Sequence, residues 1–356
     1  MMKGLILSGG KGTRLRPLTY TSAKQLVPVA NKPVLFYGIE AMADAGLKQI
    51  GIVVGDTHQE IRNAVGDGSR WNVAVTYIPQ EEPRGLAHAV AISQPFLGDT
   101  PFVMYLGDNL LNKGLRPFVD HFWNDKPAAQ ILLAKVPDPQ QFGVAELQDG
   151  KVVRLVEKPA EPRSDLALVG VYLFSPEVFT SVARIKPSFR NELEITDAIQ
   201  DLINRGLTVR PQIVDGWWKD TGRLEDMLEA NRLILDTISR NVRGDIDGMS
   251  RIEGKVIVEL GAVIRNSVIR GPAIIGANAR LLNCYVGPFT SIMNDVEVRD
   301  AEIEHSIVLE GSKIQDLGTR VEDSLIGKNV RIHRVPAKPR AYRFMLGDNS
   351  EVGIRW

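Results

Sequence analysis

The chain has 356 residues, 44% of them hydrophobic, and its 43 basic residues balance 43 acidic residues. A chain of this length and composition can bury a sizeable core and is expected to form about two domains. The balanced charge argues against a nucleic-acid partner or an anionic membrane surface, so any phosphate site must be local. The only cysteine, Cys284, cannot form an internal disulfide, and no apolar run approaches the roughly 20 residues of a membrane helix. The N-terminal apolar run is too short for a signal peptide, so the expected compartment is the cytosol.

Short β-rich runs alternate with helical patterns from residue 3 to about residue 213. The expected strands are 3–8, 50–55, 73–78, 101–108 and 128–136, and the expected helices are 34–45, 59–65 and 85–93. This order predicts βαβ units with right-handed crossovers. The expected fold class is therefore α/β, a doubly wound, mostly parallel sheet whose ligand site lies at the C-terminal ends of its strands.

A connecting helix is predicted over residues 221–239, and a six-residue repeat follows it. The repeated aliphatic positions are Ile257, Val263, Ile269, Ile275 and Leu281, then Val286, Ile292 and Val298, then Val308 and Ile314, and finally Ile326 and Ile332. A hexapeptide period is typical of a parallel β-helix, and a run of short sandwich strands is the alternative. Breaks in the repeat near Tyr285 and Gly318 predict irregular corners, and the tail from Arg334 is expected to cap the open end.

The segment LSGGKGTRLRPLT places three glycines directly after the first strand. Glycines in such a turn let backbone N–H groups approach an anion closely. The spacing fits neither common nucleotide motif, because Leu15 replaces the last glycine of Gly-x-Gly-x-x-Gly and Gly12 occupies the Ser/Thr position of a Walker loop. Arg14, Arg16 and Lys24 provide enough positive charge for a triphosphate. A purely structural turn is the alternative reading of the glycines alone.

The segments GGKGTRLRPLT and SAKQLVPVANKPVL resemble the sugar-1-phosphate nucleotidylyltransferases. The segments PQEEPRGLAHAV, YLGDN, VEKP, NELEITD and WWKDTG are similar to the branch of that family that transfers a thymidylyl group, in its longer form. The resemblance implies a Rossmann-like nucleotidyltransferase domain over residues 1–240 and a left-handed parallel β-helix over residues 245–356. It also implies a Mg2+-dependent reaction of dTTP with glucose-1-phosphate that gives dTDP-glucose and pyrophosphate, and a homo-oligomer.

Two aspartates are the candidate metal ligands. Asp108 in YLGDN ends an apolar strand, which places a carboxylate at the C-terminal edge of the sheet, and Asp220 in WWKDTG also follows a β-rich run. Magnesium prefers such hard oxygen ligands and usually takes one or two carboxylates with substrate phosphates. Taken alone, Asp108 could simply cap the following segment. The resemblance implies that both aspartates hold Mg2+.

The resemblance also implies the residues that bind the nucleotide. They are Leu7, Gly9, Gly10, Gly12, Thr13, Arg14, Gln80 and Gly85. Gln80 and Gly85 would contact the base, since an amide can both donate to and accept from the O4 and N3–H edge of a pyrimidine. Arg14 and Lys24 would neutralise the triphosphate. Without the resemblance, Gln80 would be read as an exposed loop residue, and His88 is expected to be a packing or loop-bonding residue.

The residues that the resemblance implies for the sugar phosphate are Gly143, Glu157, Lys158, Val169 and Trp218. Lys158 would hold the phosphate and Glu157 would bond the sugar hydroxyls, although a Glu-Lys pair at a strand exit is commonly just solvated. Glu192 or Glu194 could reach the sugar, but acidic residues at a helix start explain them equally well.

The catalytic residues expected from these assignments are Arg14, Lys24, Asp108 and Lys158. They would act by positioning and electrostatics, because a sugar phosphate is already a charged nucleophile. Two alternatives are the same reaction with UTP or another sugar-1-phosphate, and a non-catalytic homologue that senses nucleotide sugars. An acyltransferase on the β-helix using His305 or His333 is disfavoured because the repeat region is short.

Overall fold

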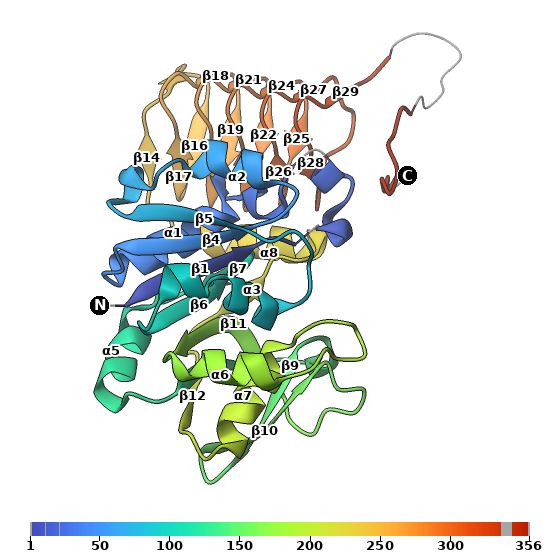
Figure 1. Ribbon diagram of the computed structural model, residues 1–356. Coiled ribbons are helices and arrows are strands. Elements are labelled where there is room, and N and C mark those ends of the chain that lie inside the picture. The colour runs from blue at the N-terminus through green and yellow to red at the C-terminus, as the bar shows by residue number, and fades with distance from the viewer. Residues whose placement is uncertain (1, 11, 21, 336–343, 355–356) are drawn as a thin grey trace. The chain divides into compact units, whose positions relative to one another are not determined.

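The computed structural model describes residues 2–10, 12–20, 22–335 and 344–354, and the chain forms two compact units (Figure 1). The first, here the sheet unit, comprises Met1–Gly12, Ser22–Leu26 and Val34–Asp220. The second, here the β-helix unit, comprises Thr13–Thr21, Val27–Pro33 and Thr221–Trp356. Two short N-terminal segments therefore belong to the β-helix unit by their contacts. The domain limits at residues 240 and 245 stay a prediction.

A nine-stranded sheet forms the centre of the sheet unit. Its strands are β1 (Lys3–Ser8), β4 (Gln49–Val54), β5 (Ala74–Pro79), β6 (Phe102–Leu106), β8 (Ala129–Lys135), β9 (Gly143–Gln148), β10 (Lys151–Glu157), β11 (Leu166–Phe174) and β12 (Val209–Ile213). β1 is parallel to both β4 and β6, and β4 is parallel to β5. β11 runs antiparallel to β6, β8 and β9, so the sheet is mixed. β10 is likewise antiparallel to β9. The predicted α/β fold and all five predicted strands are confirmed, and β10 and β11 are the antiparallel departures.

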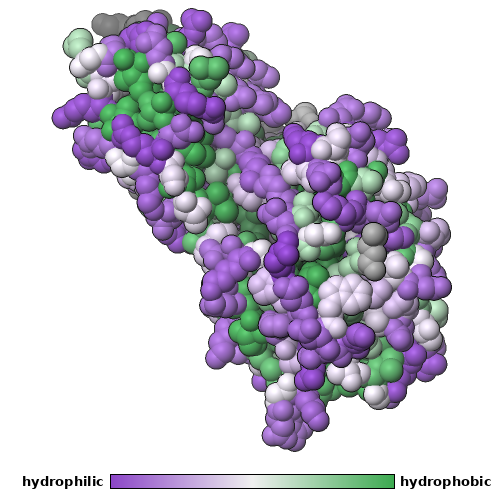
Figure 2. Space-filling model, turned by 90° about the vertical axis from the view of Figure 1, so that its left-hand side faces the viewer, coloured by the Kyte–Doolittle hydropathy of each residue, from purple (hydrophilic) through white to green (hydrophobic). Residues whose placement is uncertain are grey.

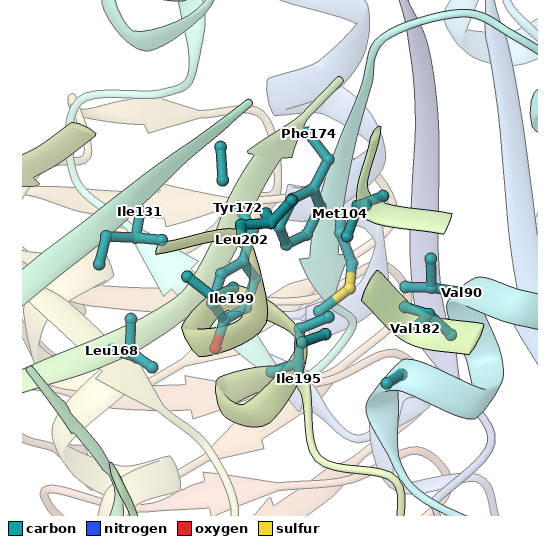
Figure 3. Packing of buried hydrophobic residues seen from close by; sticks show 14 of the residues in the cluster. Val90, Met104, Ile131, Leu168, Tyr172, Phe174, Val182, Ile195, Ile199 and Leu202 are labelled. Carbon is teal, nitrogen blue, oxygen red and sulfur yellow. The ribbon is translucent and has the colours of Figure 1, made fainter. Parts of the chain in front are cut away.

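Helices cover both faces of this sheet. They are α1 (Val34–Asp44), α2 (His58–Val65), α3 (Leu86–Ile92), α4 (Gln94–Leu97), α5 (Arg116–Asp125), α6 (Glu177–Arg184) and α7 (Ile195–Asn204). Strand β1 shows the two-sided burial, since Leu5 and Leu7 belong to one apolar cluster and Ile6 belongs to the other. In Figure 3, Ile195, Ile199 and Leu202 of α7 lie among buried side chains of β8 and β11. The three predicted helices match α1, α2 and α3.

Short elements connect this framework. They are the 3-10 helices η1 (Thr13–Leu15), η2 (Leu18–Tyr20), η3 (Lys24–Leu26), η4 (Ser69–Trp71) and η5 (Pro139–Gln141), and the strand pairs β2 (Pro28–Val29) with β3 (Lys32–Pro33) and β7 (Asn109–Leu111) with β13 (Trp218–Asp220). The glycine-rich turn thus leads into a single 3-10 turn, η1. The pair β7 and β13 brings together two segments that lie more than 100 positions apart in the sequence.

Three parallel sheets build the β-helix unit, confirming the predicted parallel β-helix. One contains β14 (Asn241–Val242), β17 (Val256–Val258), β20 (Ala273–Ile275), β23 (Thr290–Ile292), β26 (Ile307–Val308) and β28 (Leu325–Ile326). The second contains β15 (Asp245–Ile246), β18 (Val263–Arg265), β21 (Arg280–Leu282), β24 (Glu297–Arg299), β27 (Lys313–Gln315) and β29 (Arg331–His333), several of which lie side by side in Figure 1. The third contains β16 (Arg251–Glu253), β19 (Val268–Arg270), β22 (Tyr285–Val286) and β25 (Glu302–Ile303).

The predicted repeat has the wrong phase in its first coil. Val258 and Ile264 are fully buried, whereas Ile257 and Val263, the positions expected inside, are only partly buried. The cause is the strand alternation: in a strand Val-Ile-Val or Val-Ile-Arg, a shift of one residue moves the apolar set to the other face. Stacked residues such as Ile275 and Ile292 lie 17 positions apart, whereas three sides of six residues each would place them about 18 apart. One corner of each such coil is therefore one residue shorter than the hexapeptide period requires. This short corner explains the break near Tyr285.

Asn231 joins three parts of the β-helix unit. It lies fully buried on α8 (Leu224–Leu235), the helix predicted between residues 221 and 239. Its Oδ1 accepts from the backbone N–H of Ala30 at 2.9 Å and from the hydroxyl of Ser291 at 2.7 Å, and its Nδ2 donates to the carbonyl of Phe289 at 2.9 Å. One amide therefore satisfies polar groups of the β2–β3 turn and of a β-helix corner.

We expect Asn231→Ala to lower the free energy of unfolding by about 2–4 kcal/mol, because three buried or partly buried polar groups lose their partner and a small cavity opens. Thermal or urea unfolding of the full chain measures this change as a shift of the midpoint. Asn241→Ala, at an exposed position of the same unit, is the control and should shift the midpoint little. Equal midpoints for the two variants would contradict the role of Asn231.

Hydrophilic residues cover most of the face presented in Figure 2, and hydrophobic residues gather there in small groups. Among the described residues, no helix is long and apolar enough to cross a membrane. The predicted cap of the β-helix falls partly on residues 336–343 and 355–356, which lie outside the described residues.

Candidate active site

An ion pair between Lys24 and Asp108 forms the centre of the candidate site. Asp108 follows β6, Lys24 begins η3, and the ammonium contacts the carboxylate directly. Burial alone would raise the pKa of Asp108, but the charge and hydrogen bond of Lys24, with a hydrogen bond from Asn109, hold that pKa below its usual value. The carboxylate therefore stays ionised at neutral pH although its side chain is only 13% exposed.

The second predicted metal ligand lies beside the first. In the antiparallel pair of β7 and β13, Asp220 is directly opposite Asn109, the residue that follows Asp108. The Cα atoms of opposite residues in such a pair lie about 5 Å apart, so the two carboxylates belong to one small region. Two carboxylates, both hard oxygen ligands, fit a magnesium ion that shares substrate phosphates. Among the described residues, there is no cluster of three or more acidic, histidine or cysteine side chains that would form a cage for a metal without substrate.

The glycine-rich turn lies against these groups. A Cβ atom on Gly10 would come within 3.1 Å of Cε of Lys24, and one on Gly9 would come within 2.9 Å of Oε1 of Gln80. Side chains at these two positions would therefore displace a cation on one side and an amide on the other. Leu7, also predicted to bind the nucleotide, is buried near the end of β1.

Thr13 and Arg14 lie exposed on η1, and Gly12 before them has a positive φ of 63°. This 3-10 segment belongs to the β-helix unit. Within that unit Arg16 lies over the ring of Tyr20, 4.7 Å from its centroid, and the Tyr20 hydroxyl accepts a hydrogen bond from Asn349 at 2.5 Å. The segment that carries Arg14 is thus tied to the C-terminal region of the chain.

The predicted base-contacting residues lie beyond β5. Gln80 donates its backbone N–H to the carbonyl of Val54 at 2.8 Å, which fixes it at the C-terminal strand ends. Its side-chain Nε2 lies 3.0 Å from Nδ1 of His88. Burial, and next the charge of Arg84, lower the pKa of His88, so the ring is neutral at pH 7 and Nδ1 can accept this hydrogen bond. His88 was expected to be a packing or loop-bonding residue, and in the structure it contacts the side chain of Gln80, the residue predicted to bind the base.

Gly85 has a structural reason to be glycine. It precedes α3 with a φ of 102°, and a Cβ atom there would lie 2.7 Å from the backbone nitrogen of Leu193 and closer still to its carbonyl oxygen. Leu193 is itself held by hydrogen bonds from its N–H to Arg84 and from Ala87 to its carbonyl. The base contact predicted for Gly85 remains a prediction.

Four of the predicted sugar-phosphate residues lie on the neighbouring β9–β10 hairpin and on β13. Glu157 is directly opposite Gly143, and a Cβ atom on Gly143 would come within 3.1 Å of Oε2 of Glu157. Lys158 donates its backbone N–H to the carbonyl of Phe142 at 3.0 Å. The ring of Trp218 meets Phe142 edge to face at 5.4 Å, and its Nε1 donates to Oδ1 of Asn109 at 2.6 Å. Trp218, rather than Trp217, is therefore the tryptophan that links this hairpin to the carboxylates.

Val169, the fifth predicted residue, lies on β11 with a fully buried side chain, so only its backbone could face a ligand. Gly170 follows with a φ of 75° at an irregularity of β11, close to Oδ1 of Asn109. This stretch of backbone therefore lies close to Asn109, which is hydrogen-bonded to Asp108.

Arg190 is a residue that the sequence analysis missed. Its guanidinium lies 3.5 Å from Glu157, 3.1 Å from Glu192 and 3.3 Å from Glu194. Burial, and next the charge of Glu194, raise the pKa of Glu157 against the opposing effects of Lys158 and Arg190. The segment NELE was read for its acidic residues, but an arginine directly before three closely spaced acids was the available signal. Asn109, which bonds both Asp108 and Trp218, was also missed.

These contacts form one continuous series within the sheet unit. His88 holds Gln80, Gln80 meets Gly9, and the adjacent Gly10 meets Lys24. Lys24 pairs with Asp108, which accepts a hydrogen bond from Asn109. Asn109 in turn accepts one from Trp218, whose ring packs on Phe142. The carbonyl of Phe142 accepts from the backbone of Lys158, the neighbour of Glu157. A glycine turn, an amide, carboxylates and two lysines in series suit the transfer of a phosphoryl-linked group between two phosphorylated ligands.

Fold and site together define a nucleotidyltransferase. The chain belongs to the nucleotidyl transferase family, whose model matches residues 3–237. It is 56% identical over 354 residues to the glucose-1-phosphate thymidylyltransferase of Streptomyces griseus, covering 99% of each chain, and 52% identical over 356 residues to that of Streptomyces antibioticus, covering 99% of this chain and 100% of the relative. A crystal structure of a Bacillus anthracis protein assigned as a glucose-1-phosphate thymidylyltransferase covers 65% of this chain and 95% of its own, with a TM-score of 0.62 and 37% identity.

Proposed function

We propose that this nucleotidyltransferase transfers a thymidylyl group from dTTP to glucose-1-phosphate, producing dTDP-glucose and pyrophosphate. The observation that carries the proposal is the 56% identity to a glucose-1-phosphate thymidylyltransferase over both units of the chain. The continuous series from Gln80 to Glu157 supports it, because it offers one end to a base and the other to a sugar. The alternatives with UTP or another sugar-1-phosphate are decided by the same experiment.

The reaction is an in-line displacement at phosphorus. An oxygen of the sugar phosphate forms a bond to the α-phosphorus of dTTP, and the bond from that phosphorus to the bridging oxygen breaks as pyrophosphate leaves. The sugar phosphate is largely dianionic above a second pKa near 6, so it needs no general base. The protein must instead overcome repulsion between two anions and stabilise charge on the leaving group.

The residues divide this work. Lys24 would neutralise the triphosphate, together with Arg14 as the resemblance implies, and Lys158 would hold the attacking phosphate. Asp108 and Asp220 would hold Mg2+, which supplies Lewis-acid stabilisation of phosphate charge when bound. Glu157, kept in place by Arg190, would accept hydrogen bonds from sugar hydroxyls.

The test is pyrophosphate release by the full chain with Mg2+ and glucose-1-phosphate, with dTTP, UTP, ATP, GTP and CTP supplied separately. Faster pyrophosphate release with dTTP than with the other nucleotides supports the proposal. Faster release with another nucleotide would show that the enzyme uses that nucleotide instead of dTTP. Release with dTTP only when another sugar-1-phosphate is supplied would replace the sugar assignment. No pyrophosphate release with any combination of nucleotide and sugar-1-phosphate would favour the alternative that the protein is a non-catalytic homologue that senses nucleotide sugars.

We expect Glu157→Gln to raise the KM for glucose-1-phosphate about tenfold or more without lowering thermal stability, because one charge-assisted hydrogen bond to the sugar is weakened. The raised pKa of Glu157 means that the folded chain binds its proton more tightly than the unfolded chain does. Its ionised form therefore lowers the free energy of unfolding at pH values above the folded-state pKa.

The measurements for this variant are steady-state kinetics and thermal unfolding at pH 7.5. Glu161→Gln, at an exposed position just beyond the hairpin, is the control and should alter neither quantity. An unchanged KM, or a large loss of stability in Glu157→Gln, would refute the assignment.

A further inference from the structure

The amide of Gln80 is oriented by a hydrogen bond to His88, and it lies close to Gly9. Its Nε2 faces Nδ1 of His88 at 3.0 Å, and its Oε1 lies on the side of Gly9. His88 is in the first turn of α3, whereas Gln80 follows β5 and Gly9 follows β1. Three elements thus meet around a single amide at the C-terminal strand ends.

The orientation of an amide determines which bases it can bind. A neutral histidine with its proton on Nε2 accepts at Nδ1, so it takes one N–H of Gln80 and leaves the second N–H and Oε1 for a ligand. Thymine and uracil present an acceptor at O4 beside a donor at N3–H, and cytosine presents a donor at N4 beside an acceptor at N3. One orientation of the amide matches the first pattern, and the reversed orientation matches the second.

We propose that His88 is a specificity-determining residue, which holds the Gln80 amide in the orientation that accepts a 4-oxopyrimidine nucleotide and rejects a cytosine nucleotide. The inference rests on the proposed function, in which Gln80 reads the base. His88 acts through Gln80 and is a positioning residue.

Protonation of His88 would reverse this selection. The imidazolium donates from both nitrogens, so the amide would have to turn Oε1 toward Nδ1 and present N–H groups where N3–H of thymine binds. Arg84 and Glu82 are the charged groups that act on His88, and they oppose each other, with burial and Arg84 prevailing to keep the ring neutral. Selection for dTTP over dCTP is therefore greatest at neutral and higher pH.

The experiment compares kcat/KM for dTTP and dCTP in the wild type, His88→Leu and His88→Asn, with glucose-1-phosphate and Mg2+. We expect the leucine variant to lower the dTTP/dCTP ratio about tenfold, mainly through KM for dTTP, since one bidentate match to a base edge is lost. Asparagine offers Oδ1 in place of Nδ1 and should restore most of the ratio. The wild-type ratio should fall as the pH is lowered below 6.5, the ordinary pKa of histidine, and the ratio of the leucine variant should stay flat.

His121→Leu is the matched control, because His121 makes the same Nδ1 contact with a glutamine, Gln212, at 2.8 Å on the exposed side of α5. It should leave the ratio unchanged. An active leucine variant with a wild-type ratio, or an equal loss of ratio in leucine and asparagine variants, overturns the role of His88 alone. Absence of activity in the wild type with every nucleotide overturns the proposed function and this inference with it.

Discussion

Asp108→Asn is expected to lower kcat for pyrophosphate release about 100-fold or more, the scale of losing one preorganised electrostatic group. The substitution keeps the shape of the side chain but removes the charge that pairs with Lys24 and that would hold Mg2+. Because the pKa of Asp108 is held below its usual value, the wild-type carboxylate is ionised throughout the neutral range, so the loss should be the same from pH 6 to pH 8.

Asp215→Asn is the matched control for this variant. Asp215 also pairs with a lysine, Lys113, but both side chains are more than half exposed. Exposed pairs of this kind contribute about 0–1 kcal/mol, so kcat should not change. The kinetics are measured well below the unfolding midpoint, since a depressed pKa also means that Asp108 contributes stability at neutral pH that Asn removes. A rate for Asp108→Asn within threefold of the wild type would remove Asp108 from the mechanism.

Most of the sheet unit could be predicted because its information is local. The runs KGLILS and PFVMYLGD read as buried strands from a few residues each, and the parallel half of the sheet follows from their alternation with helices. The antiparallel β11 could not be predicted in the same way. Its direction depends on partners on both sides, β6 and β8, rather than on its own apolar run.

The β-helix shows where a periodic pattern stops being sufficient. The period itself identified the fold, but in the first coil both Ile257 and Val258 are β-branched and apolar, so composition could not choose which one faces inward. The attachment of the β2–β3 turn to α8 was also not predictable. It depends on one amide, Asn231, that meets Ala30 across about 200 positions of sequence.

For the candidate site, the family resemblance identified individual residues, and the structure shows which of them contact one another. The strand that precedes it indicated Asp108, whereas the roles of Gln80 and Glu157 came from the resemblance alone. Asn109 and Arg190 were missed, and His88 was expected only to pack or to bond a loop, because a neighbour that positions a functional group carries no motif of its own. Only the distances between side chains reveal that role.

Gly85→Ala is expected to destabilise the full chain by about 4 kcal/mol or more. The φ of 102° is a conformation that side chains rarely adopt, and the added Cβ would overlap the backbone of Leu193 rather than a side chain that could move. Leu193 cannot shift freely because Arg84 and Ala87 are hydrogen-bonded to its backbone. Thermal and urea unfolding measure the loss.

Gly98→Ala is the control that separates backbone strain at a positive φ from steric overlap of the added Cβ atom. Gly98 also has a positive φ, 58°, but a Cβ atom there would have no neighbour within 4 Å, so Gly98→Ala should lower the free energy of unfolding by about 1–2 kcal/mol.

In the Gly85 variant we also expect weaker binding of both substrates. Leu193 lies between Glu192 and Glu194, which pair with Arg190, and α3 carries His88. A single displacement would then disturb the base side and the sugar side together, and a variant that loses affinity for only one substrate would contradict this coupling.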